Sequence, residues 1–240
     1  MLLTYSELLS EGLLLFLTFF GAVVTALLAG IAFHEFSHAF VADRLGDRTA
    51  RAAGRVSLNP LRHLDPTGTV LLMIGGFGWG KPVPVNPSRL RNGPKNGRAV
   101  VAAAGPIANL LLAVLASLPL HAGLVDWRSP FVVPPSVSGW EVGDYLGLYL
   151  AALITFNVVL AVFNLLPLAP LDGFAVAVGL LPRDLSRSVA RLERYGPGIL
   201  LLLFVLPFVS QGSISILHEV MSPLINGLTE LIAGGGKAIA

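Results

Sequence analysis

The 240-residue chain contains no cysteine and few charged residues. Without cysteine it can form no disulfide, no cysteine-ligated zinc or iron–sulfur site and no thiol nucleophile. Only 12% of the residues are charged and 54% are hydrophobic, whereas soluble domains carry about 25% charged residues. So few charges would leave large apolar patches on a water-soluble globule of this length. The composition therefore predicts a membrane protein, and the net charge of +2 offers no basic surface for nucleic acid, which is not an expected partner.

Four uncharged runs are long enough to cross a bilayer, since about 20 helical residues span about 30 Å of hydrocarbon. They are Gly12 to Phe33, Ala99 to Val125, Tyr145 to Leu171 and Tyr195 to Leu217. Two further stretches, Pro66 to Gly80 and Met221 to Ala240, are too short or too interrupted by Pro and Gly to be assigned. We therefore expect an all-α polytopic membrane protein with four to six transmembrane helices. It forms a single domain over residues 1–240, with a core at 12–182 and carboxy-terminal membrane segments at 195–240.

The basic residues indicate the orientation in the membrane. Ten of the sixteen Lys and Arg residues lie between Arg44 and Arg98, and four more lie between Arg183 and Arg194. The segment from Asp126 to Asp144 has Arg128 alone. Because short cytoplasmic loops hold an excess of basic residues, both basic segments are predicted in the cytoplasm and the amino terminus outside.

The main chemical signal is the sequence His34-Glu35-Phe36-Ser37-His38 at the end of the first apolar run. Two histidines four residues apart share one helix face and can bind one zinc ion, while the intervening glutamate reaches water on the metal. Ionisable side chains that continue a membrane helix carry an insertion cost of about 2.5–3.5 kcal/mol each, which favours a functional role over coincidence. We expect zinc at this position.

A catalytic zinc site needs a third protein ligand, and Asp172 is the best candidate. It directly follows the third apolar run and precedes Arg183 by about as many residues as His34 precedes Arg44, which predicts a common depth. The alternative is that Asp172 only caps a short helix that starts after Pro170. Other acidic and histidine residues are poorer ligands by position: His63, Asp65, His121, His218 and Glu219.

These motifs resemble the site-2 protease family of intramembrane zinc metalloproteases in its compact prokaryotic form. The resemblance covers about residues 12–182 and includes the HExxH, Leu171-Asp172-Gly173, Gly105-Pro106-x-x-Asn109 and a glycine-rich stretch that leads into Gly78 to Pro87. It implies zinc on His34, His38 and Asp172, Glu35 as catalytic base and Asn164 near the scissile carbonyl. It also implies a prokaryotic plasma membrane protein, and the distribution of basic residues predicts that its active site lies toward the cytoplasm. Neither loop has room for the PDZ or CBS domain of some relatives.

A membrane-spanning substrate must unwind before it is cut, so an element of the protein should pair with the unwound strand. The stretch Gly75 to Val85 suits a re-entrant loop or edge strand between the first two core helices, and a simple cytoplasmic turn is the alternative. The expected substrates are single-span membrane proteins. The residues expected to bind them are Gly76, Gly78, Trp79 and Asn109. Asn109, Asn157 and Asn164 could equally well form hydrogen bonds between helices, and the sequence suggests no role for His63 and Asp65.

The alternative functions would need other sets of residues. A membrane metal transporter or a non-proteolytic metal-binding protein would need the ligands but not a glutamate beside the metal. An aspartyl intramembrane protease would need two membrane aspartates, and a serine protease would need a Ser–His pair at one depth. Glu35 therefore favours the zinc metalloprotease.

The predicted orientation can be measured with topology reporters. A reporter fused between residues 126 and 144 should read external, and one fused near Arg89 should read cytoplasmic, because basic residues are retained on the cytoplasmic side. The reverse readings would contradict the common depth of His34 and Asp172.

Overall fold

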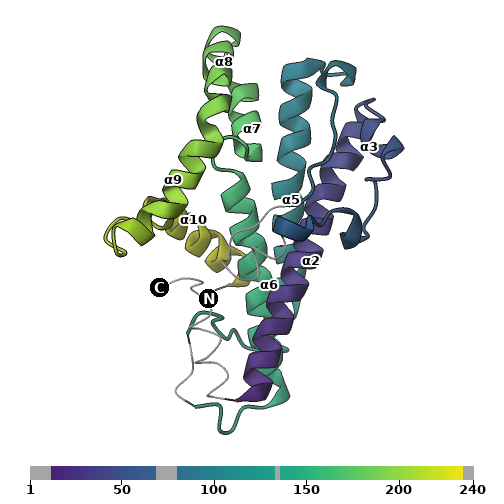
Figure 1. Cartoon of the computed structure of the whole chain (residues 1–240). Coiled ribbons are helices and arrows are strands. Elements are labelled where there is room, and N and C mark those ends of the chain that lie inside the picture. Colours follow the sequence, from purple (N-terminus) through teal and green to yellow (C-terminus); the bar gives the residue numbers. More distant parts are fainter. Residues whose placement is uncertain (1–11, 69–79, 133–135, 235–240) are drawn as a thin grey trace.

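The computed structural model describes residues 12–68, 80–132 and 136–234, and this part of the chain is helical (Figure 1). The long helices are α2 (Leu13–Arg44), α5 (Gly93–His121), α6 (Val142–Asn164), α9 (Gly196–Val209) and α10 (Ile216–Ala233). Shorter elements are α3 (Thr49–Ala52), α7 (Asp172–Leu180), α8 (Arg183–Ala190) and the 3-10 turns η1 (Pro60–Arg62), η2 (Pro87–Arg89) and η3 (Arg191–Tyr195). Among the described residues, four helical segments are long and apolar enough to span a membrane, which confirms the predicted polytopic helical architecture.

Helices α2, α5 and α6 pack against one another and form the core of the molecule (Figure 1). Toward the amino-terminal end of α2, Leu15 and Phe19 pack with Leu148 and Phe156 of α6. Farther along α6, Val158 and Val162 pack with Ala113 of α5 and Ile225 of α10. The residues that face outward remain apolar, which is the pattern of helices surrounded by lipid rather than water.

The third predicted span is interrupted by a turn, and this turn determines the position of Asp172. The apolar run continues to Leu171, but α6 ends at Asn164 and a tight turn precedes α7. Pro167 and Pro170 lie in this turn, and proline cannot supply the N–H group that would continue a helix. Gly173 also allows a close approach, since a Cβ atom there would lie 2.1 Å from the carbonyl oxygen of Leu165. Helix α7 then packs along α5.

The fourth span also differs from the predicted range. It runs from Arg183 to Val209 through α8, η3 and α9, whereas the apolar run predicted Tyr195 to Leu217. The helix ends at Val209 because Gln211 and Gly212 take positive φ angles of 53° and 84°, which reverse the chain. Most of the unassigned stretch Met221 to Ala240 belongs to α10, which returns to α6 and α5 (Figure 1).

The basic segment between α2 and α5 is tied together by Asp47. This carboxylate is fully buried and accepts hydrogen bonds from the Thr49 N–H (3.1 Å), the Thr49 hydroxyl (2.5 Å) and the Asn86 N–H (2.5 Å). Burial alone would raise the pKa of Asp47, but the hydrogen bonds from Thr49 and Asn86 lower it below its usual value. The charged carboxylate thereby joins the end of α2 to the residues that precede η2.

Two glycines of α2 test how closely the core helices pack. A Cβ atom at Gly30 would lie 2.8 Å from Leu160 and 3.0 Å from the Asn157 side chain, whereas one at Gly21 meets nothing within 4 Å. Alanine favours a helix over glycine by about 1 kcal/mol, so Gly21→Ala should hold or raise the melting temperature in detergent. Gly30→Ala should lower it by several degrees, because the helices must separate. Equal melting temperatures for both variants would contradict this close packing.

Candidate metal centre

Three side chains from two distant parts of the chain meet between α2 and α7. Oδ2 of Asp172 lies 3.0 Å from Nε2 of His34 and 3.2 Å from Nε2 of His38. Both histidines are buried, and Asp172 retains 21% of its side-chain exposure. Within the described part of the chain, this is the only group of three or more histidine and acidic side chains close enough to share a metal ion. The structure thus brings together the three residues that the sequence predicted as ligands.

The outer ring nitrogens of both histidines fix which nitrogen carries the proton. Nδ1–H of His38 donates to the carbonyl oxygen of Val101 at 2.7 Å, and a carbonyl oxygen can only accept. Nδ1 of His34 lies 2.7 Å from Oδ1 of Asn109. With both protons directed away from the cluster, each Nε2 presents a lone pair toward Asp172.

The orientation of the Asn109 amide follows from a chain of hydrogen bonds across three helices. Its NH₂ group donates to the carbonyl oxygen of Gly30 and to Oδ1 of Asn157, each at 3.1 Å. The Asn157 amide is fixed in turn, because its NH₂ donates to the carbonyl oxygen of Leu153 at 2.9 Å. Oδ1 of Asn109 is therefore the acceptor for His34. Both asparagines are buried and serve hydrogen bonds between helices, one of the two roles that the sequence left open.

The geometry fits a small tetrahedral cation. Oδ2 of Asp172 is buried and faces the Nε2 atoms of both histidines, so three potential ligand atoms converge on one point. A tetrahedral zinc ion with bonds of about 2.0–2.1 Å holds its ligands about 3.3 Å apart, close to the observed separations. Gly105 leaves room beside the cluster, since a Cβ atom there would lie 2.5 Å from Nε2 of His38 and 2.6 Å from Nε2 of His34.

Asp172 does not act as a helix cap. The residue that caps α7 is Leu171, Asp172 is the first residue of the helix, and no side chain forms a capping hydrogen bond there. The Asp172 carboxylate faces the two histidines instead. The capping alternative is therefore wrong.

Glu35 follows His34 on α2 and lines the same cavity of about 890 Å³ as the three clustered side chains. The cavity lies among α2, α5, α6, α7 and α9 and the extended segment at residues 80–85. No hydrogen bond or ion pair engages the Glu35 carboxylate within the described part of the chain, so it is available to water or a ligand. Gly80 lies close by, since a Cβ atom on it would be 3.7 Å from Oε1 of Glu35.

Asn164 ends α6 on the wall of the same cavity. Its NH₂ group donates one hydrogen bond to the carbonyl oxygen of Leu160 at 2.9 Å. An amide nitrogen has two N–H bonds, so the second remains for another acceptor. The structure therefore places Asn164 on the wall of the cavity that also contains the cluster, and its role near the cleaved carbonyl stays a prediction.

The extended segment at residues 80–85 is held in place by two buried residues, Arg55 and His63, whose roles the sequence did not explain. Arg55 donates hydrogen bonds to the carbonyl oxygens of Lys81 and Pro82, and its Nη2 lies 3.4 Å from Nδ1 of His63. His63 is fully buried and donates from Nε2 to the carbonyl oxygen of Ser57 at 2.6 Å. The His63 carbonyl oxygen also accepts the Lys81 N–H at 2.7 Å.

The predicted re-entrant or edge-strand element is only partly described. Gly76, Gly78 and Trp79 lie outside the described residues, so their role in substrate binding stays a prediction. From Gly80 onward the chain is extended, with a single antiparallel bridge between Leu64 and Gly80. Asn109 lines the cavity, but its described hydrogen bonds are all internal, so its contact with substrate also stays a prediction.

Sequence reasoning missed three supporting groups: Arg55, Asn157 as the partner of Asn109, and the carbonyl oxygen of Val101. Arg55 precedes His63 by eight residues in an unpatterned loop, and a main-chain carbonyl has no sequence signature. Asn157 is an amide in an uncharged helix, which signals that a partner exists without naming it.

Comparisons with known proteins agree with this geometry. The profile of Peptidase family M50 matches residues 22–124. A Bacillus subtilis protein named "Putative zinc metalloprotease YwhC" is 38% identical over 191 residues, which cover 78% of this chain and 82% of that protein. "Putative zinc metalloprotease Rip2" of Mycolicibacterium smegmatis is 28% identical over 222 residues, covering 90% and 78% of the two chains. The Rip2 of Mycobacterium tuberculosis is 28% identical over 235 residues, covering 92% and 80%.

No solved structure matches this one. The motifs, the clustered ligands and the similarity to YwhC over most of both chains lead to one assignment: the chain belongs to Peptidase family M50, the site-2 protease family.

Proposed function

We propose that this multi-pass membrane protein is an intramembrane zinc metalloprotease that hydrolyses peptide bonds in or near the transmembrane segments of other membrane proteins. The observation that carries the proposal is the convergence of Nε2 of His34, Nε2 of His38 and Oδ2 of Asp172, with both histidine protons directed away. These three atoms are the proposed zinc ligands. Bound zinc would supply Lewis-acid activation of water and of the substrate carbonyl.

Glu35 is the proposed general base. It lines the cavity beside the ligands and has no described partner that would hold its carboxylate elsewhere. Its carboxylate can take a proton from the attacking water and deliver it to the leaving amide nitrogen, so that the peptide bond is replaced by a carboxylic acid and an amine. A metal transporter needs no such group, and the open position of Glu35 therefore supports hydrolysis.

Asn164 is proposed to bind the carbonyl oxygen of the peptide that is cut. Its first N–H is used by Leu160, which fixes the amide plane, and its second N–H is left for the substrate. A hydrogen bond to the oxygen that gains negative charge would stabilise the transition state more than the ground state.

The extended segment at residues 80–85 is the proposed docking strand for the substrate. It lines the cavity with Gly80, Pro82, Val83 and Val85 and begins close to Glu35. No main-chain hydrogen bond uses the N–H of Val83 or Val85 within the described residues. An unwound substrate strand could therefore pair with this segment, while Arg55 and His63 hold it in place from the other side.

We further propose that the chain resides in the plasma membrane of a prokaryote and that the active site lies toward the cytoplasmic side. Support comes from the two basic segments, which follow the end of α2 at Arg44 and the end of α7 at Leu180. Both the ligands and the basic residues then lie in the same half of the molecule.

The zinc and base assignments predict separable effects. The purified protein should carry about one zinc ion per chain, and the His34→Ala, His38→Ala double variant should lose it. Glu35→Gln should retain zinc while cleavage of a single-span substrate in liposomes falls about 10²–10⁴-fold, because only the base is removed. Asp172→Asn should weaken both zinc binding and cleavage, since a neutral amide is a poor zinc ligand.

Metal content and cleavage are measured on the same preparations. Full zinc in the double-histidine variant, or undiminished cleavage by Glu35→Gln, would overturn these roles. If the parent cleaves nothing but moves zinc across a sealed vesicle, the protein is a transporter.

The support of the docking strand by Arg55 is tested with Arg55→Met, which keeps an unbranched apolar stem but removes the donors to Lys81 and Pro82. We expect KM to rise about tenfold, equivalent to about 1.4 kcal/mol of substrate binding, with little change in kcat or zinc content. Arg51→Met is the matched control, because the Arg51 side chain is exposed and, within the described residues, bonds only Asp43. Loss of zinc or of kcat in Arg55→Met, with KM unchanged, would contradict a positioning role.

A further inference from the structure

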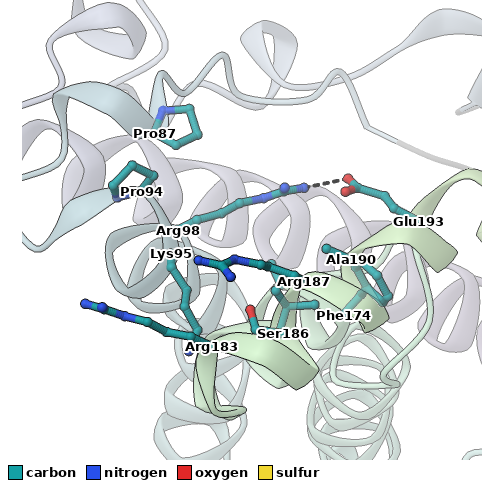
Figure 2. Close-up of a pocket in the computed structure, with 12 residues that line it drawn as sticks. Pro87, Pro94, Lys95, Arg98, Phe174, Arg183, Ser186, Arg187, Ala190 and Glu193 are labelled. Carbon is teal, nitrogen blue, oxygen red and sulfur yellow. Dashed lines mark hydrogen bonds and ion pairs between the residues drawn. The ribbon is translucent and has the colours of Figure 1, made fainter.

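A second cavity, of about 420 Å³, lies among α5, α7, α8 and η3 (Figure 2). Its walls carry four basic side chains, Lys95, Arg98, Arg183 and Arg187, and one acidic side chain, Glu193. Figure 2 shows these basic groups around Ser186, whose side chain is buried in the cavity wall. We call this hollow the basic cavity.

Two of its four basic side chains, Lys95 and Arg183, have no carboxylate partner among the described residues. Lys95 donates to the main-chain carbonyl oxygen of Leu181, which carries no net charge. Arg187 lies 3.5 Å from Asp184, but both side chains are largely exposed, so water screens this pair strongly. Arg183 forms no ion pair with any described residue. Only Arg98 has a close carboxylate partner, Glu193, at 2.7 Å.

The basic cavity adjoins the cavity that contains Glu35 and the three clustered side chains, which we call the catalytic cavity. Five residues line both: Pro87, Arg98, Phe174, Ala175 and Glu193. The Arg98–Glu193 pair joins α5 to η3 at this junction, and both side chains are about half exposed. A peptide that leaves the catalytic cavity on this side therefore enters a space with an excess of positive charge.

Three elements lead from one cavity to the other in the same direction. Along α5 the catalytic cavity is lined by Ala102 and the basic cavity by Lys95, about 10 Å apart at 1.5 Å per residue. Along α7, Val178 lies about 9 Å beyond Asp172 by the same rise. The docking strand starts beside Glu35 and continues to Pro87, which lines both cavities.

We propose that the basic cavity binds acidic side chains of the substrate. These side chains lie in the segment that flanks the cleavage site and extends from the catalytic cavity into the basic cavity. This inference rests on the proposed protease function and defines its substrate class. An extended peptide advances about 3.3 Å per residue, so the acidic residues lie about three to six positions from the cut bond. Segments that carry Lys or Arg at these positions are repelled, which separates substrates from the many membrane proteins with basic cytoplasmic flanks.

The experiment exchanges charge between protein and substrate. Three single-span substrates share one transmembrane segment and carry Asp and Glu, Ser, or Lys at positions three to six of the flank. The parent should cleave the acidic substrate with a kcat/KM about tenfold above the serine substrate, mainly through KM, and the lysine substrate least well. The Arg183→Glu, Arg187→Glu double variant should reverse this order, and the milder Arg183→Gln, Arg187→Gln variant should weaken the preference.

The matched control is Arg89→Glu, Arg91→Glu, which changes the net charge equally at exposed positions that line neither cavity. It should keep the parent's preference for the acidic flank. Zinc content reports that every variant is folded at the metal centre. Reversal of preference by the control, or equal cleavage of all three substrates by the parent, would overturn the proposal. So would a preference that follows the anionic lipid content of the liposomes and ignores the flank.

A binding measurement separates this inference from the protease assignment. The same three flanks are titrated as soluble peptides against Glu35→Gln, which is expected to keep zinc without turnover. Tightest binding of the acidic peptide, weakened by salt and reversed by the Arg183→Glu, Arg187→Glu changes, supports the basic cavity even if the parent cleaves nothing. Equal binding of all three peptides refutes it even if the parent is an active protease.

Discussion

Polar groups buried at membrane depth must be satisfied within the protein, and this requirement governs the centre of the molecule. Two histidine nitrogens and a carboxylate oxygen converge on one point there, an arrangement that a cation stabilises. The histidine protons are used elsewhere, by Val101 and Asn109. Asn109 is held by Gly30 and Asn157, so the tautomer of His34 depends on the packing of three helices.

Close helix packing makes this arrangement possible. Gly30 lets α2 approach the asparagines of α5 and α6, and Gly105 leaves the space beside both histidines. The break after Asn164 has the same effect on α7, because it turns the chain so that Asp172 reaches α2. The glycines have no side chain to keep the helices apart, and the prolines have no N–H group to continue the helix. Both therefore contribute to the site as directly as the candidate ligands do.

The catalytic and basic cavities adjoin along α5 and α7, with the proposed docking strand beside them. Apolar and hydrogen-bonding surface near Glu35 suits an unwound membrane segment, and positive charge at the far end suits its flank. Arg55 and His63 explain how an extended segment rich in proline keeps its position without belonging to a sheet. Local hydrogen bonds from the loop replace the neighbouring strand that a sheet would provide.

The sequence by itself determined the membrane class and the number of apolar spans and predicted the candidate ligands, because hydropathy and the spacing of His34 and His38 are local properties. Its depth argument also found Asp172. The roles of Asn109 and His63 and the position of Arg55 were decided only by the tertiary structure. Each depends on contacts between residues far apart in the chain, such as those of His34 with Asn109 and Arg55 with Lys81. A periodic pattern in one segment carries no information about which distant atom completes a hydrogen bond.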